Sequence, residues 1–192
     1  MQKGLTREQV ISGAAALVET EGFTALSLAA LARRLQIKTP SLYNHIAGLQ
    51  DLKNALGCRA LQLLYGQIEQ ASAHDEAERL YAMAEAYCQF VREHPALYAA
   101  ILQMPTPAPD AFSRASAALL QLVCRQLLPY KLSEEERIHA VRGLRSLAHG
   151  FAGLQLSHAF NLPADQSESL RWILTCYLSG LQRQSQAPSG GL

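Results

Sequence analysis

The chain has 192 residues, of which 49% are hydrophobic and 17% are charged, with a formal net charge of +1. The charged share lies below the roughly 25% of an average domain, so we expect a large core, a buried subunit interface, or both. The length allows one large domain or two unequal ones. Seven basic and four acidic residues give residues 1–66 a net charge of +3, which is compatible with a nucleic-acid-binding module.

Spacing and composition argue against several classes of protein. The cysteines Cys58, Cys88, Cys124 and Cys176 form no C-x-x-C pair or Cys/His cluster, so we expect reduced, buried thiols and no structural zinc. The six histidines are scattered and no nucleophile–base pair is evident, so we expect neither an enzyme nor a cofactor or metal. There is no signal peptide and no apolar run of ~20 residues, so a cytoplasmic protein without a membrane partner is expected.

Helical periodicity runs through nearly the whole chain, and the predicted fold class is all-α with about nine helices. Thr6 begins the first helix as part of a capping box, Gly22 ends it and Ser27 begins the second helix. A turn at residues 36–38 follows. After a third, very short helix, further helices are expected at about residues 49–72, 75–93, 96–103, 111–128, 133–160 and 165–183.

The third helix falls in the stretch IKTPSLYNH, residues 37–45, and is too short to be stable alone in water. Thr39 is its expected N-cap, with Pro40 as the first helical residue. Leu42 and Ile46 are four residues apart and can both face a core shared with the first two helices. A tight corner between two such helices is typical of a helix-turn-helix motif, whose second helix presents small polar side chains to DNA bases. A merely solvated face on a helical hairpin is the competing interpretation.

Residues 6–52, TREQVISGAAALVETEGFTALSLAALARRLQIKTPSLYNHIAGLQDL, resemble the DNA-binding domain of the TetR family of bacterial transcriptional regulators. The matching features are the Thr-capped first helix with its Ala-rich centre, the Gly22-Phe23 turn, Ser27, the Leu31-Ala32 pair, the apolar-Lys-Thr-Pro-Ser corner and Leu42-Tyr43-x-His45. Residues 145–154, RSLAHGFAGL, resemble the C-terminal domain of one subgroup with a His-Gly pair.

The resemblance implies a three-helix DNA-binding domain at residues 1–48 and a ligand-binding and dimerisation domain at residues 49–185. A helix at about 49–72 links the two, and a tail at 186–192 is expected to be disordered. The implied function is a ligand-responsive regulator of transcription. We expect a repressor that binds a palindromic operator in double-stranded DNA as a homodimer, associates with the nucleoid, and is released by a small, largely apolar effector.

The resemblance also implies which residues contact DNA. Those facing base edges in the major groove would be Thr39, Pro40, Ser41 and Asn44. Those touching or orienting the phosphate backbone would be Ser27, Lys38, Tyr43 and His45. Leu49 departs from the family pattern, because it stands where the family usually has a lysine. One lost phosphate contact predicts weaker binding and a shallower salt dependence.

Two further sites are expected in the helical body. Residues that could line an effector pocket between the middle helices are Tyr65, Tyr87, Phe90, Tyr98, Leu102, Met104, Phe112 and His149. Ordinary core packing is the competing interpretation for each of them. Mid-helix glycines Gly143, Gly150 and Gly153 indicate the close approach of another helix, because each costs about 1 kcal/mol against alanine. An interface in which two helices from each subunit form a four-helix bundle would include Leu147, Phe151, Leu154, Trp172, Cys176 and Ser179.

Two other functions compete with the regulator. An enzyme in the helical body would need a catalytic cluster that the sequence does not display. A protein-binding helical adaptor that has lost DNA binding is the other alternative. Leu49 favours it, because the lysine that the family usually has at this position is missing. Substitution of Tyr43 separates the regulator from the adaptor, because only the regulator needs that side chain to bind DNA.

Overall fold

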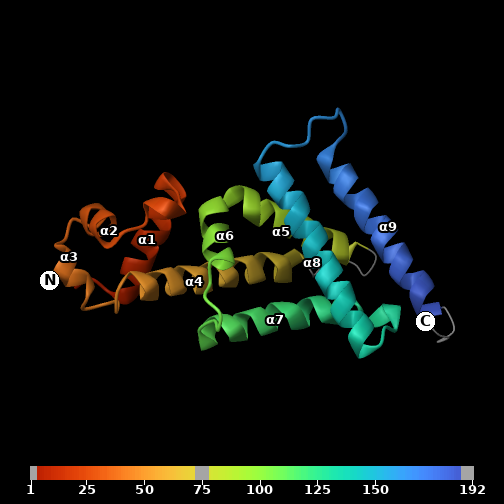
Figure 1. Cartoon of the computed structure of the whole chain (residues 1–192), viewed down its shortest axis with the longest axis horizontal. Helices are drawn as coiled ribbons and strands as arrows, with labels where there is room; N and C mark the ends of the chain where they lie inside the picture. Colours follow the sequence, from red (N-terminus) through yellow and green to blue (C-terminus); the bar gives the residue numbers. More distant parts are fainter. Residues whose placement is uncertain (1–3, 72–77, 187–192) are drawn as a thin grey trace. The chain divides into compact units, whose positions relative to one another are not determined.

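The computed structural model describes residues 4–71 and 78–186, and these contain helices and turns but no strand (Figure 1). The helices are α1 (Arg7–Glu21), α2 (Leu28–Arg34), α3 (Thr39–Leu42), α4 (Leu49–Ala71), α5 (Arg79–Glu93), α6 (Pro95–Leu102), α7 (Asp110–Gln126), α8 (Glu134–Leu156) and α9 (Gln166–Gln186), with 3-10 turns η1 (Phe23–Ala25) and η2 (Leu128–Tyr130). For the described residues, the predicted all-α class with about nine helices is confirmed. The expected start of a helix at residue 75 lies outside them. Of the tail expected at 186–192, Gln186 is instead the last residue of α9, and residues 187–192 lie outside the described part.

The predicted end of the long helix near residue 160 is wrong, since α8 ends at Leu156. His158 adopts a left-handed conformation with φ 52°, and the amide of Ala159 donates to the carbonyl of Leu154 at 2.9 Å. The chain then turns back, and the ring of Phe160 packs 4.8 Å from that of Phe151. A local hydrogen-bonded cap and an aromatic contact therefore end this helix, although the sequence has no glycine or proline there.

Contacts divide the chain into two compact units. The first comprises residues 1–63 and 94–116, and the second comprises residues 64–93 and 117–192. The first unit thus adds most of α4, α6 and the start of α7 to the three helices of the expected DNA-binding domain. The domain boundary expected at residue 48 remains a prediction.

The first unit is organised around the inward faces of its helices. Val10, Leu17, Leu31 and Leu52 are at most 1% exposed. The capping box at Thr6 and the N-cap at Ser27 are present as predicted, and both use the side-chain oxygen to accept a backbone N–H. These caps satisfy amides that the first turn of a helix would otherwise leave without a partner.

The second unit places α5 against α8, with α9 packed beside both. Figure 1 shows α8 and α9 as an antiparallel pair, because the chain reverses direction at the loop that joins them. Phe90 and Leu174 are almost completely buried in this unit. On its surface, Arg171 of α9 pairs with both carboxylate oxygens of Glu78 and lies 4.7 Å from the ring centroid of Tyr81.

The expected close helix approach is present at one of the three glycines. The hydroxyl of Tyr177 in α9 donates to the carbonyl of Ala140 at 3.0 Å, and a Cβ added at Gly143 would stand 2.1 Å from that hydroxyl oxygen. At Gly150 and Gly153, an added Cβ would meet nothing within 4 Å. Within the chain, only Gly143 of these three is therefore required by the packing of α8 on α9.

Replacing Gly143 with alanine should lower the free energy of unfolding by about 1–3 kcal/mol, the usual cost of overpacking. The new methyl group would displace Tyr177 and break its hydrogen bond to Ala140. Gly66→Ala is the matched control, because an added Cβ there meets nothing within 4 Å, and it should stabilise α4 by up to about 1 kcal/mol. Urea unfolding of both variants checks this, and equal effects would contradict it.

Candidate DNA-binding site

The short helix α3 and the turn after it are anchored in the core by two apolar side chains. Leu42 is fully buried and Ile46 is 3% exposed, which confirms the predicted anchors. Beyond α3 the chain continues in turns, with the amides of His45 and Ile46 both donating to the carbonyl of Leu42 at 2.9 and 3.0 Å. The buried anchors thus lie within one continuous hydrogen-bonded segment.

The expected start of α3 is off by one residue. Thr39 is the first helical residue and Lys38 occupies the N-cap, with no side-chain hydrogen bond to the helix. The first turn closes instead through the amide of Ser41, which donates to the carbonyl of Lys38 at 2.9 Å. Pro40, now the second helical residue, is still tolerated because the first amides of a helix have no partner within it.

The residues expected to contact DNA divide into two groups by exposure. Lys38, Pro40, Tyr43 and Asn44 are exposed, whereas Ser27, Thr39, Ser41 and His45 are half-buried. Tyr43 is 59% exposed. Half of this set is thus exposed on the surface, where a DNA duplex could contact it. The contacts with bases and phosphates remain predictions.

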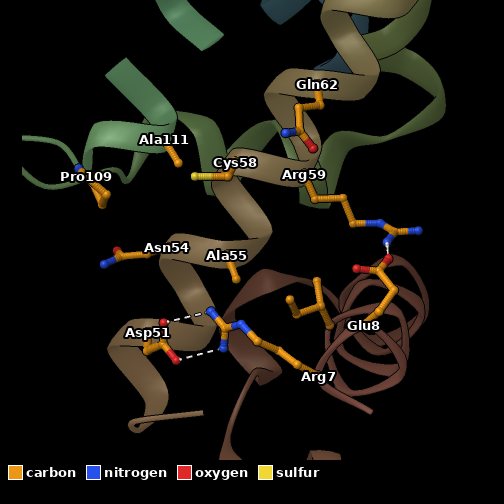
Figure 2. Close-up of a pocket in the computed structure, with 11 residues that line it drawn as sticks. Arg7, Glu8, Asp51, Asn54, Ala55, Cys58, Arg59, Gln62, Pro109 and Ala111 are labelled. Carbon is orange, nitrogen blue, oxygen red and sulfur yellow. Dashed lines mark hydrogen bonds and ion pairs between the residues drawn. The ribbon is translucent and has the colours of Figure 1, made fainter. Parts of the chain in front are cut away.

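Sequence reasoning missed a polar cluster just behind α3. The guanidinium of Arg7 donates to both carboxylate oxygens of Asp51, at 3.0 Å each (Figure 2). The same Arg7 also donates to the carbonyl of His45 at 3.0 Å. Asp51 in turn accepts the amide of Ala47 at 3.0 Å. We call Arg7, Asp51 and their two backbone partners the α3–α4 clamp.

The clamp changes the acidity of both its side chains. The hydrogen bond from Arg7 lowers the pKa of Asp51 below its ordinary value, and the amide of Ala47 acts in the same direction. The same hydrogen bond raises the pKa of Arg7. Both groups therefore stay charged at neutral pH. The sequence offers one signal for this cluster. Asp51 lies in the first turn of the predicted helix, where acidic residues are favoured.

A second ion pair joins the same two helices further along, between Arg59 of α4 and Glu8 of α1 (Figure 2). Between the two pairs lies a cleft of about 370 Å³, lined by α1, α4 and the start of α7. The side chain of Cys58 lines it too, and burial raises the pKa of this thiol. Cys58 is therefore protonated at neutral pH and is a poor nucleophile.

The residues predicted to line an effector pocket fall in both units. Tyr65, Tyr87, Phe90 and His149 belong to the second unit, and Tyr98, Leu102, Met104 and Phe112 belong to the first. Phe90 and Tyr98 are buried, whereas Leu102 and His149 are exposed. Met104 packs against α4, where its sulfur would lie 2.2 Å from a Cβ at Gly57. The pocket itself stays a prediction.

The residues predicted to form a dimer interface are mostly accessible. Leu154 and Trp172 are 47% and 69% exposed, Cys176 is exposed, and Leu147 and Ser179 are half-buried. Phe151 is buried within its own chain. The expectation of buried thiols holds for Cys88, whose pKa burial raises to about 11, but it is wrong for the exposed Cys176; Cys58 and Cys124 are intermediate.

Two further observations concern the described part of the chain. No group of three His, Cys, Asp or Glu residues there could hold a metal ion. No helix in residues 4–71 and 78–186 is both long enough and apolar enough to cross a membrane.

Comparison with known proteins agrees with this geometry. The family model described as "Tetracyclin repressor-like, C-terminal domain" matches residues 80–177. The uncharacterised HTH-type transcriptional regulator YobS of Bacillus subtilis is 36% identical over 181 residues, covering 93% of each chain. A Rhodococcus protein of unknown function has a similar structure, with a TM-score of 0.82, 22% identity and coverage of 94% of this chain and 97% of that one. A TetR variant from Acinetobacter baumannii, solved in complex with minocycline, has a TM-score of 0.70 and 19% identity. This match covers 96% of this chain and 100% of that one.

A helix-turn-helix unit joined to a larger helical body defines the class of one-component, DNA-binding regulators of transcription. The chain belongs to the TetR family of these regulators.

The clamp should make folding stability depend on pH in the acid range. A carboxylate whose folded pKa is lowered stabilises the fold fully above its unfolded pKa of about 3.9, and this contribution is lost as pH falls through the folded pKa. Between pH 7 and pH 3, the wild type should therefore lose more free energy of unfolding than Asp51→Asn, by up to about 1 kcal/mol for an exposed pair. Urea unfolding at both values measures this, and equal losses would contradict it.

Proposed function

We propose that the protein is a repressor that binds a palindromic operator as a homodimer and leaves it when a small, largely apolar effector binds. The observation that carries this proposal is a set of exposed side chains on α3 and the residues that flank it, namely Lys38, Pro40, Tyr43 and Asn44. The same segment carries the buried anchors Leu42 and Ile46. A short polar helix held firmly from one side is what major-groove recognition requires.

The roles within this surface follow from side-chain chemistry. Thr39, Ser41 and Asn44 carry hydroxyl and amide groups that can read base edges, and Pro40 offers an apolar contact to a thymine methyl. Lys38, Tyr43, His45 and Ser27 would bind or orient phosphates. In the cell, such a protein would be cytoplasmic and nucleoid-associated.

Exposed apolar side chains on α8 and α9 support the proposed dimer. Leu154 and Trp172 are large, apolar and accessible, and Gly150 and Gly153 of α8 leave room for a second backbone. Pairing this face with its copy would give a two-fold symmetric protein. Its recognition helices would then fit half-sites about one DNA turn apart, ~34 Å.

The effector part of the proposal is supported by the family and by chemistry. The related TetR fold was solved with minocycline bound, and the middle helices of this chain carry buried aromatic residues such as Phe90 and Tyr98. To release DNA, the effector must bind one conformation more tightly than the other.

Tyr43→Ala should reduce binding to the operator by at least roughly tenfold, because a hydrogen bond to a charged phosphate contributes about 1.5–3 kcal/mol. Stability should not change, since Tyr43 is 59% exposed. Tyr43→Phe, which keeps the ring but lacks the hydroxyl, should show a similar loss. The measurement is a gel shift with duplexes that the wild type selects from a random-sequence library. Unaltered binding by Tyr43→Ala would favour the adaptor function instead.

Trp172→Glu should convert the dimer into monomers at micromolar concentration, because a charge would be buried without a partner in the interface. The folded monomer should tolerate the change, as Trp172 is 69% exposed. Leu162→Glu is the control, because Leu162 is 84% exposed and lies in the loop between α8 and α9. Native mass spectrometry distinguishes the two states. A wild type that is only monomeric would contradict the proposed interface.

A further inference from the structure

We propose that Arg7 and Asp51 are positioning residues for DNA recognition, which set the orientation of α3 without contacting DNA themselves. The inference rests on the proposed function, because orientation of α3 matters only if this helix enters a DNA groove. It assigns a role to two side chains that lie outside the exposed surface of α3.

The geometry of the clamp connects two helices and the turn after α3 through one guanidinium. Arg7 is the first residue of α1, Asp51 lies in the first turn of α4, and the carbonyl of His45 belongs to the turn that follows α3. A planar guanidinium can make these bonds together because its donors form a rigid fork that matches a carboxylate. A lysine would present a single point charge in its place.

The segment between α3 and α4 needs such a constraint. The four-residue α3 ends at Leu42, and the chain passes through Gly48, which has φ 140°, before α4 begins at Leu49. The clamp bonds to this segment twice, through the carbonyl of His45 and the amide of Ala47. Functional groups that read a surface must be held within about 0.5 Å and 10–20°, and burial of Leu42 alone does not fix a rotation.

The chain contains a natural comparison for this clamp. The pair of Glu8 and Arg59 also joins α1 to α4, and the side chain of Glu8 is 72% exposed. Its hydrogen bond runs from the guanidinium of Arg59 to the carboxylate of Glu8, and neither residue belongs to the turn between α3 and α4. Removing it should loosen the helix pair slightly, as expected for a surface ion pair, and should leave the orientation of α3 unchanged.

Charge and position predict opposite results for Asp51→Asn. This substitution removes a negative charge close to the DNA-binding surface, so electrostatics alone predicts tighter binding. Positioning predicts weaker binding, because the neutral amide cannot hold Arg7 as a carboxylate does. We expect a loss of roughly tenfold on the selected duplex. Binding to a scrambled duplex should change less than about twofold, and the salt dependence should stay the same, because no phosphate contact is lost.

Three variants complete the test, each measured by fluorescence anisotropy on the selected and the scrambled duplex at several salt concentrations. Arg7→Lys keeps the charge but loses the fork, and should match Asp51→Asn. Glu8→Gln is the control and should stay within about twofold of the wild type. Arg7→Gln should lose specific binding with an unchanged salt slope, whereas a slope reduced by about one would show that Arg7 itself binds a phosphate.

The outcomes separate this inference from the proposed function. If Asp51→Asn binds as well as the wild type, or if Arg7→Lys keeps full affinity, the positioning role is overturned. Thermal melting shows whether each variant is folded at the assay temperature. If Asp51→Asn is not folded, the binding of Arg7→Lys decides whether the positioning role holds. A wild type that selects no duplex at all overturns the proposed function, and the inference with it.

Discussion

Burial of Leu42 and Ile46 is the interaction on which the recognition surface depends. A helix of four residues cannot form alone, because nucleating a helical turn costs more than its few hydrogen bonds return. Burying each of these two side chains contributes about 1.5–3 kcal/mol, which favours the packing of this segment against α2. Its outward side chains are then not needed for stability. Tyr43 and Asn44 can be exposed because the stability of α3 comes from its other face.

Apolar burial and the α3–α4 clamp act on different degrees of freedom. The hydrophobic effect is non-directional, so Leu42 and Ile46 fix how deeply α3 sits in the first unit. Hydrogen bonds depend on angle, so Arg7 and Asp51 can fix how the following turn is oriented. Leu49 adds to the importance of orientation. It is half-buried at the start of α4, where it cannot supply the phosphate contact of a lysine, and affinity then rests more heavily on a well-placed α3.

Features with local causes could be predicted from sequence. The caps at Thr6 and Ser27 depend on residues three positions apart, and the anchors Leu42 and Ile46 follow from helical spacing. The clamp could not be predicted, because Arg7 and Asp51 are 44 positions apart and neither follows an apolar period. The left-handed conformation of Gln36, with φ 56°, could not be predicted either, because glycine is the residue that normally indicates such a conformation. The exposure of Cys176 depends on how α9 packs, which periodicity alone does not determine.

The continuity of α4 connects the clamp with the proposed effector response. Asp51 lies in the first turn of α4, and the same helix continues past residue 63 into the second unit. A helix transmits displacement along its axis because its backbone hydrogen bonds resist bending. The hydrogen bonds of the clamp weaken steeply when their angles change, so a displacement of the start of α4 would weaken the clamp. The turn after α3 would then be held less firmly, because two of the four hydrogen bonds of the clamp are made to its backbone.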